Sequence, residues 1–332
     1  MKLKPIAEQV IVITGASSGI GLATAQAAAK RGARVVLNSR DETDLATATE
    51  RITAGGGEAM FFAGDVSDHI SMRSLADAAV AAYGRIDTWV NNAGVSVYGE
   101  LTEVTLADAR RLFETNYWGT VNGSLAAVER LEGSGGALIN VGSELSDTAY
   151  PLQGHYAASK HAVKGFTDTL RMELEKRDAP ISVTLIQPAA IDTPYPQHAE
   201  NYMDAEPKHQ APVYAPEIVA DAILACAESS RRNVLVGGAA KVVIAVEKFA
   251  PGLGDKLKIA TAFDAQRSDW PVRDTSTLHA PRPGDGKVRG RYPGHVAKTS
   301  VYTKAALHPM VALAGVAVGV GVVMALQASR AD

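Results

Sequence analysis

The stretch from Ser143 to Lys160, SELSDTAYPLQGHYAASK, holds three side chains that could move a proton. Tyr156 and Lys160 are four residues apart, so they share one face of a helix. A free tyrosine has a pKa of about 10 and is a poor acid or base at neutral pH. A nearby ammonium favours the phenolate and lowers that pKa, so Lys160 could activate Tyr156. Ser143 could donate a hydrogen bond to a substrate oxygen. A Tyr–Lys pair by itself is usually a surface feature, so this prediction depends on the rest of the chain.

A second candidate site is the glycine-rich turn within residues 9–21, QVIVITGASSGIG. The apolar run that precedes the turn predicts a strand buried on both faces, and a helical pattern follows it. Gly15 would permit the tight turn, Gly19 would let a pyrophosphate approach the backbone, and Gly21 would let the helix pack on the strand. A helix start offers free N–H groups and a positive dipole end to such an anion. The spacing differs from G-x-G-x-x-G, and one glycine turn is weak evidence of a nucleotide site.

Strand and helix patterns alternate for about 240 residues and would position both sites. Repeated β-α-β units predict an α/β fold with a doubly wound parallel sheet of about seven strands and helices on both faces. Ligands in such folds bind beyond the carboxyl ends of the strands. Strands are predicted in 10–14, 33–39, 58–66, 86–94, 136–143 and 181–188, and a last helix-and-strand unit is predicted in 215–238.

Composition excludes several classes of protein. Hydrophobic residues make up 46% and charged residues 21% of the chain, as in a globular core. A net charge of −3 gives no nucleic-acid footprint. The single cysteine, Cys226, excludes an internal disulfide and the usual zinc patterns, and no metal is predicted. The N-terminus leads directly into the first strand without room for a signal peptide, which predicts a cytoplasmic domain.

The C-terminal quarter of the chain differs from the rest in composition and in its lack of hydrophobic periodicity. We expect a domain over 1–250, then an irregular linker over 251–308, rich in Pro, Gly and charge. Residues 309–327 contain no charge and just reach the length that crosses a bilayer. As a membrane helix this run would tether the domain, and the basic residues before it would place the domain on the inner face of the membrane. Gly315 and Gly319 would let two such helices approach closely. The alternative is a helix that packs on protein.

Taken together, the motifs resemble those of the short-chain dehydrogenase/reductase family over residues 9–237. The resemblance implies a Rossmann fold and hydride transfer between a nicotinamide cofactor and a carbonyl or alcohol. The motifs that carry it are Thr14–Gly21 (TGASSGIG), Asp65-Val66, Asn91–Gly94 (NNAG), Asn116, Ser143 and Tyr156–Lys160 (YAASK).

The resemblance also implies catalytic roles. Tyr156 would donate the proton in reduction and accept it in oxidation. Lys160 would lower the pKa of Tyr156 and bind the nicotinamide ribose, while Ser143 would position the substrate oxygen. Asn116 would hold a water that links Lys160 to solvent.

The cofactor residues follow in the same way. Asp65 would accept from the adenine amino group beside the Val66 backbone, and Ile191 and Thr193 would meet the nicotinamide carboxamide. The family commonly has Pro-Gly where this chain has Pro188-Ala189, and Ala189 would be strained if its φ were positive. The predicted set is Gly15, Ser17, Ser18, Gly19, Ile20, Ser39, Arg40, Asp65, Val66, Asn92, Ala93, Gly94, Tyr156, Lys160, Ile191 and Thr193.

The end of the second strand bears on the choice of cofactor. An acidic residue there would bind the adenosine ribose and repel a 2′-phosphate. This chain has Ser39 and then Arg40, whose guanidinium suits a phosphate, so we expect NADP(H). Arg40 could instead pair with Asp41 on the surface.

The substrate is left open. Residues 194–216 fall where the family places a substrate-covering loop, with Tyr195, His198, Tyr202 and His209 among its side chains. A membrane anchor would suit a lipophilic carbonyl or alcohol. Other readings are an NADPH-binding sensor or scaffold, which would need no proton donor, and a sugar-nucleotide epimerase or dehydratase, which usually has a different glycine spacing. A homo-oligomer is expected from the family habit.

Overall fold

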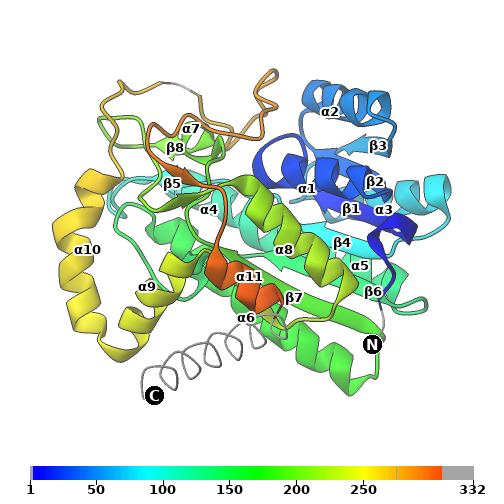
Figure 1. Cartoon of the computed structure of the whole chain (residues 1–332). Coiled ribbons are helices and arrows are strands. Elements are labelled where there is room, and N and C mark those ends of the chain that lie inside the picture. The colour runs from blue at the N-terminus through cyan, green and yellow to red at the C-terminus, as the bar shows by residue number, and fades with distance from the viewer. Residues whose placement is uncertain (1–2, 274, 309–332) are drawn as a thin grey trace, which may run out of the picture.

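Within residues 3–273 and 275–308, which the computed structural model describes, seven parallel strands form the central sheet (Figure 1). Their order is β10-β7-β6-β4-β1-β2-β3. The strands are β1 (Val10–Thr14), β2 (Arg34–Ser39), β3 (Glu58–Ala63), β4 (Thr88–Asn91), β6 (Gly136–Val141), β7 (Ile181–Pro188) and β10 (Asn233–Val236). The predicted doubly wound Rossmann-type fold is confirmed. Strand order reverses between β1 and β4, which opens a crevice at their carboxyl ends.

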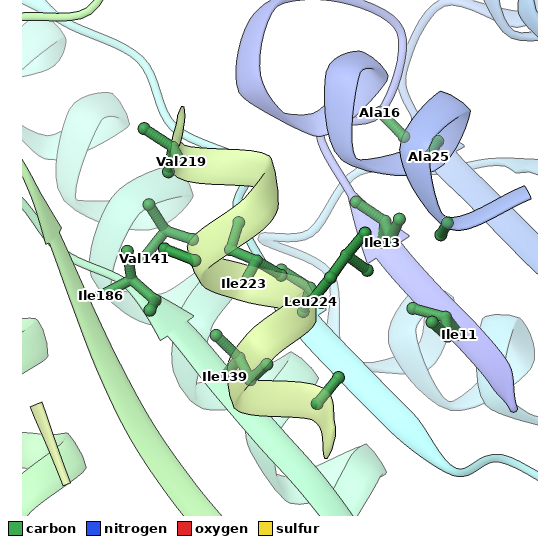
Figure 2. Close-up of a cluster of buried hydrophobic side chains, with 14 of the residues drawn as sticks. Ile11, Ile13, Ala16, Ala25, Ile139, Val141, Ile186, Val219, Ile223 and Leu224 are labelled. Carbon is green, nitrogen blue, oxygen red and sulfur yellow. The ribbon is translucent and has the colours of Figure 1, made fainter. Parts of the chain in front are cut away.

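Helices cover both faces of the sheet, and each face has its own buried cluster. Helices α1, α2 and α8 pack on one face, and α3, α5 and α6 on the other. Figure 2 shows Ile223 and Leu224 of α8 among the side chains of the strands, such as Ile13 and Ile139. The helices up to this point are α1 (Gly19–Lys30), α2 (Glu42–Ala54), α3 (His69–Tyr83), α4 (Leu106–Phe113), α5 (Gly119–Leu131), α6 (Gly154–Lys176), α7 (Tyr195–His198) and α8 (Pro216–Glu228).

Capping, a π-helical turn and burial on both faces of the sheet account for the local form of several of these elements. Helix α2 starts after Asp41, whose carboxylate accepts from the amide of Asp44 at 2.9 Å. Between α4 and α5 the chain forms a π-helical turn, Glu114–Trp118, which contains Asn116. Strands β1 and β7 are buried along their whole length, because helices cover the sheet on both sides.

The range 251–308, expected as an irregular linker, is not irregular throughout. Helix α9 (Gly238–Phe249) is followed by α10 (Pro251–Ala265), and the chain later forms β11 (Val296–Ala297) and α11 (Val301–Leu307). Strand β11 pairs in parallel with β9 (Val213–Tyr214), while β5 (Val97–Tyr98) pairs with β8 (Glu200–Asn201). The prediction relied on missing periodicity, but long-range hydrogen bonds and ion pairs hold this segment, and those need no periodic pattern.

The predicted helix at 309–327 lies outside the described residues. Among the residues that the structure does describe, no helix combines the length and the apolar composition needed to cross a bilayer.

Candidate active site

Ser143, Tyr156 and Lys160 lie around one pocket beyond the carboxyl end of β6. Tyr156 is hydrogen-bonded to the side chains of Ser143 and Tyr195. Oγ of Ser143 accepts from the amide of Leu145 at 3.1 Å, because Ser143 caps the 3₁₀ turn that follows β6. This contact occupies an acceptor position of Ser143 and leaves its hydroxyl proton available for donation.

Asn116 is fully buried beside this pocket and organises the loop after β4. Its Oδ1 accepts from the amide of Val95 at 2.8 Å, and its Nδ2 donates to the carbonyl of Val95 at 3.0 Å. A Cβ added to Gly94 would lie 3.4 Å from Oδ1 of Asn116 and 3.7 Å from Nζ of Lys160. Asn116 therefore lies near Lys160, and its side chain is hydrogen-bonded to the backbone of Val95.

The electrostatics of Tyr156 differ from the expectation. Burial raises its pKa to about 12, although the hydrogen bonds from Ser143 and Tyr195 act in the opposite direction. Burial lowers the pKa of Lys160 to about 8. Nζ of Lys160 donates to the carbonyl of Val141 at 2.9 Å and lies 5.7 Å from the centre of the Tyr156 ring. In this arrangement burial is the largest influence on the pKa of Tyr156, and the charge of Glu144 raises that pKa further.

The glycine turn forms a narrow backbone cradle. Gly15 has φ +63°, and a Cβ there would lie 2.7 Å from Cα of Ala93. A Cβ on Gly21 would lie 2.1 Å from the carbonyl oxygen of Gly15, so α1 approaches the turn as closely as backbone allows. The side-chain Nδ2 of Asn92 donates to the carbonyl oxygens of Thr14 and Gly15 at 3.0 and 3.1 Å and fixes the turn.

A cleft beside this cradle contains most of the predicted cofactor residues. The members of the set that line it are Gly15, Ser17, Ser18, Gly19, Ile20, Ser39, Arg40, Asp65, Val66, Asn92, Ala93, Gly94 and Thr193. Ile191, Tyr156 and Lys160 line the adjoining pocket instead.

Arg40 is not paired with Asp41, whose carboxylate caps α2. Its guanidinium donates to three carbonyl oxygens in the C-terminal segment, those of Thr277, Leu278 (3.1 Å) and His279 (3.5 Å). Burial lowers the pKa of Arg40, and the negative charge of Asp65 opposes that effect.

Asp65 also has protein partners. Its carboxylate accepts from the amide of Ser67 at 2.9 Å and pairs with Arg111 at 2.5 Å. Burial would raise the pKa of Asp65, but these hydrogen bonds and the charge of Arg111 outweigh burial and lower it. Asp65 therefore remains ionised at the edge of the cleft.

The expected strain at Ala189 is absent. Among the described residues other than glycine, positive φ occurs at Leu152 and Asp178 and not at Ala189. The neighbouring Gly237 takes a φ of +104°, and a Cβ there would lie 2.8 Å from Cβ of Ala189. Gly237, which directly follows β10, therefore packs against Ala189 with a backbone conformation that favours glycine.

Sequence reasoning missed Glu144 and Gln266 in the lining of the pocket, whereas His209 was among the side chains expected in the substrate-covering loop. Glu144 follows Ser143, and burial raises its pKa to about 7. Burial lowers the pKa of His209 to about 4, and its ring stacks on Tyr195 with centres 6.1 Å apart. The position of Glu144 after a strand end was a usable signal, whereas no local pattern marks Gln266, which lines the same pocket from the end of α10.

Comparisons with known proteins agree with this geometry. A family model described as "short chain dehydrogenase" matches residues 9–203. The chain is 44% identical over 322 residues to the uncharacterized oxidoreductase YxnA of Bacillus subtilis, covering 96% of this chain and 90% of that protein. It is 32% identical over 244 residues to the putative oxidoreductase SadH of Mycobacterium tuberculosis, covering 71% of this chain and 88% of that protein.

A solved relative shows the same fold. The short chain dehydrogenase/reductase from Burkholderia phymatum, determined in complex with NAD, superimposes with a TM-score of 0.68 at 27% identity. The match covers 76% of this chain and 96% of that one. Since the family model spans more than half of the chain and two relatives above 30% identity cover more than two thirds of it, this protein is an oxidoreductase of the short-chain dehydrogenase/reductase family.

Proposed function

We propose that this protein transfers hydride between NADP(H) and a carbonyl or alcohol substrate, with Tyr156 as the general acid and base. The observation that carries the proposal is that the cofactor cleft opens into the pocket around Tyr156. The cofactor cleft and the Tyr156 pocket share lining residues, namely Ile20, Asn92, Gly94, Thr193 and Tyr195. A ligand extended along the cleft therefore reaches the tyrosine.

The proton chemistry follows from the side chains. A bound nicotinamide supplies or accepts the hydride. Tyr156 holds its proton through neutral pH, because burial keeps its pKa near 12, and releases it only to an oxygen that gains negative charge. The Ser143 hydroxyl directs that oxygen towards Tyr156, and the nearby Lys160 cation stabilises the phenolate that remains. Asn116 would hold the relay that returns a proton through Lys160.

The test is turnover by the full chain with NADPH and a panel of aldehydes, ketones and steroid-like carbonyls, alongside Tyr156→Phe. We expect Tyr156→Phe to lose about 10²–10⁴-fold in kcat while it keeps the cofactor affinity of the wild type, measured by fluorescence titration. Equal turnover by both forms would rule out Tyr156 as the acid. Tight NADPH binding without turnover on any substrate would favour the sensor.

The preference for NADP(H) is part of the proposal and rests on Arg40. The three carbonyl contacts use its two terminal nitrogens, and a guanidinium has five N–H donors, so donors remain for a 2′-phosphate. Ser39 adds no charge that would repel the phosphate.

For Arg40→Ala we expect the affinity for NADPH to fall by about 10–100-fold, since a hydrogen bond to a charged group contributes about 1.5–3 kcal/mol. The affinity for NADH should change much less, and isothermal titration with both cofactors measures the difference. An equal loss for both would contradict the preference and would mean that Arg40 acts only through the carbonyls of residues 277–279.

The lining of the pocket bears on the substrate. Apolar side chains such as Leu145 and Ile191 and the aromatic ring of Tyr98 lie beside polar side chains such as Glu144, Lys208 and Gln210. This mixture supports a carbonyl or alcohol with an apolar body and at least one polar group. A purely hydrocarbon ketone would leave the polar side chains without partners.

A further inference from the structure

Residues 276–291, here called the cleft strap, lie between α10 and β11 and cross the cofactor cleft. In Figure 1 the orange part of the chain runs past α7 towards α1 and α2. Thr277, Pro281, Arg282 and Asp285 line the same cleft as the glycine turn. The strap is therefore a wall of this cleft.

One end of the strap is fixed beside Arg40. The carbonyl oxygen of Leu278 accepts from Arg40 at 3.1 Å and from Arg111 at 3.2 Å. The side chain of Leu278 is fully buried, in a cluster that includes Leu112. His279 adds a contact of 2.6 Å to Asp108.

The other end is fixed beside the glycine turn. The amide of Gly19, the first residue of α1, donates to the carbonyl oxygen of Lys287 at 2.9 Å. A Cβ on Gly290 would lie 2.3 Å from the carbonyl oxygen of Thr193, so the two backbones touch. Arg289 pairs with Glu217 at 2.8 Å and lies 3.5 Å from Asp192.

The charges along the cleft indicate what the strap adds. Asp41, Asp44, Asp65 and Asp285 line the cleft, whereas its lining arginines are Arg40 and Arg282. A dinucleotide brings further negative charge from its phosphates. Asp65 is already paired with Arg111, and Asp285 belongs to the strap itself. Without Arg282, the carboxylates of Asp41, Asp44 and Asp285 would share the cleft with those phosphates and Arg40 would be the one lining guanidinium, which is an unfavourable balance.

We propose that the cleft strap is a cofactor-binding element, which closes over the dinucleotide and brings Arg282 against its phosphates. This inference rests on the proposed function, because it requires a dinucleotide in the cleft. Arg282 lies in the cleft lining and 3.8 Å from Asp285, which is also part of the strap. Because the strap contacts both Arg40 and Gly19, it must lift from the domain for a cofactor to enter or leave.

The test uses the full chain and reduced nicotinamide fluorescence. Equilibrium titration gives the Kd of NADPH and NADH, and stopped-flow displacement by the oxidised cofactor gives the dissociation rate. The variants are Arg282→Ala, which removes the charge, and Gly290→Ala, which pushes the strap from Thr193. Matched controls are Arg177→Ala, on the surface beside Glu132, and Gly252→Ala, where a Cβ meets nothing within 4 Å.

For Arg282→Ala we expect the Kd of both cofactors to rise about tenfold, which corresponds to about 1.4 kcal/mol, with a weaker dependence on salt. For Gly290→Ala we expect the dissociation rate to rise by a similar factor, and for both controls no change. Arg282→Lys should recover part of the affinity. Thermal unfolding shows whether each variant is folded. If Gly290→Ala does not fold, the result for Arg282→Ala alone decides whether the strap binds the cofactor.

The outcomes separate the two proposals. If the wild type binds neither cofactor, the proposed function fails. If it binds cofactor and both strap variants behave like their controls, only the role of the strap is overturned. If Gly290→Ala speeds cofactor dissociation but Arg282→Ala leaves the Kd unchanged, the proposed contact between Arg282 and the phosphates is wrong.

Discussion

At the scale of single residues, burial dominates the chemistry of the Tyr156 pocket. Desolvation raises the pKa of Tyr156 to about 12 and that of Glu144 to about 7, and it lowers the pKa of Lys160 to about 8. The charge of Glu144 also contributes to the raised pKa of Tyr156. A residue that titrates near neutrality therefore stands beside the proposed general acid and affects it.

Glu144→Gln should reveal this titration. The pKa of Glu144 is raised on folding, so its favourable contribution is complete below its usual pKa and is lost as pH rises through 7. We expect the wild type to lose more unfolding free energy than Glu144→Gln between pH 5 and pH 7.5, as measured by urea denaturation. The variant's profile of kcat/KM against pH should also lack a transition near 7.

Glu132→Gln is a suitable control, because Glu132 is half exposed at the surface and pairs only loosely with Arg177, at 3.5 Å. It should leave both profiles unchanged. If the stability of the wild type and of Glu144→Gln changed with pH in the same way, folding would not raise the pKa of Glu144, and the prediction would be wrong.

At the scale of elements, the contact between the glycine turn and α1 decides whether a cofactor site can form. Gly21 lies within α1, where a larger residue would normally favour the helix. Its position against the carbonyl oxygen of Gly15 excludes any Cβ. Tertiary contact thus overrides helix propensity at this residue.

Gly21→Ala should destabilise the protein by about 1–3 kcal/mol, the usual cost of forcing extra atoms into a packed site, and should weaken cofactor binding. Gly165→Ala is the matched control, because Gly165 lies in α6 with nothing within 4 Å of its added Cβ. The control should stabilise the protein by about 0.4–1 kcal/mol. Urea denaturation measures the change in unfolding free energy for both variants. If both changes had the same sign, the proposed packing of Gly21 against Gly15 would be wrong.

At the scale of the whole molecule, the C-terminal segment is part of the folded domain. Leu278, far along the chain from the sheet, is as buried as the residues of the core and shares a cluster with Val95, Leu112 and Leu145. Arg291 pairs with Glu206 at 2.5 Å and ties the strap to the loop before α8. Unfolding should therefore involve the strap and the domain together.

Leu278→Ala is expected to cost about 2–5 kcal/mol of unfolding free energy, as for other buried leucines. Leu253→Ala in α10 should change it by less than about 0.5 kcal/mol, since that side chain is 57% exposed. Denaturant midpoints of the two variants provide the comparison. If the strap did not pack against the domain, both substitutions would change the free energy of unfolding by similar, small amounts.

The sequence by itself determined the fold and where the proposed catalytic residues would gather. Strand and helix signals are local and periodic, and the carboxyl ends of parallel strands meet at one edge, so Ser143, Tyr156 and Lys160 were expected together. Glycines at 15, 19 and 21 were recognisable because only glycine meets the steric demands of the turn.

Only the tertiary structure decided the partners and charges of those residues. The pKa of Tyr156 depends on burial by segments distant in sequence, and the contacts of Arg40 come from residues 277–279. The strap has no periodicity because backbone carbonyls, glycine contacts and ion pairs hold it, and their partners lie up to about 270 residues away, as between Gly19 and Lys287. Such contacts leave no local pattern in a sequence, since they form only when the folded domain brings both partners together.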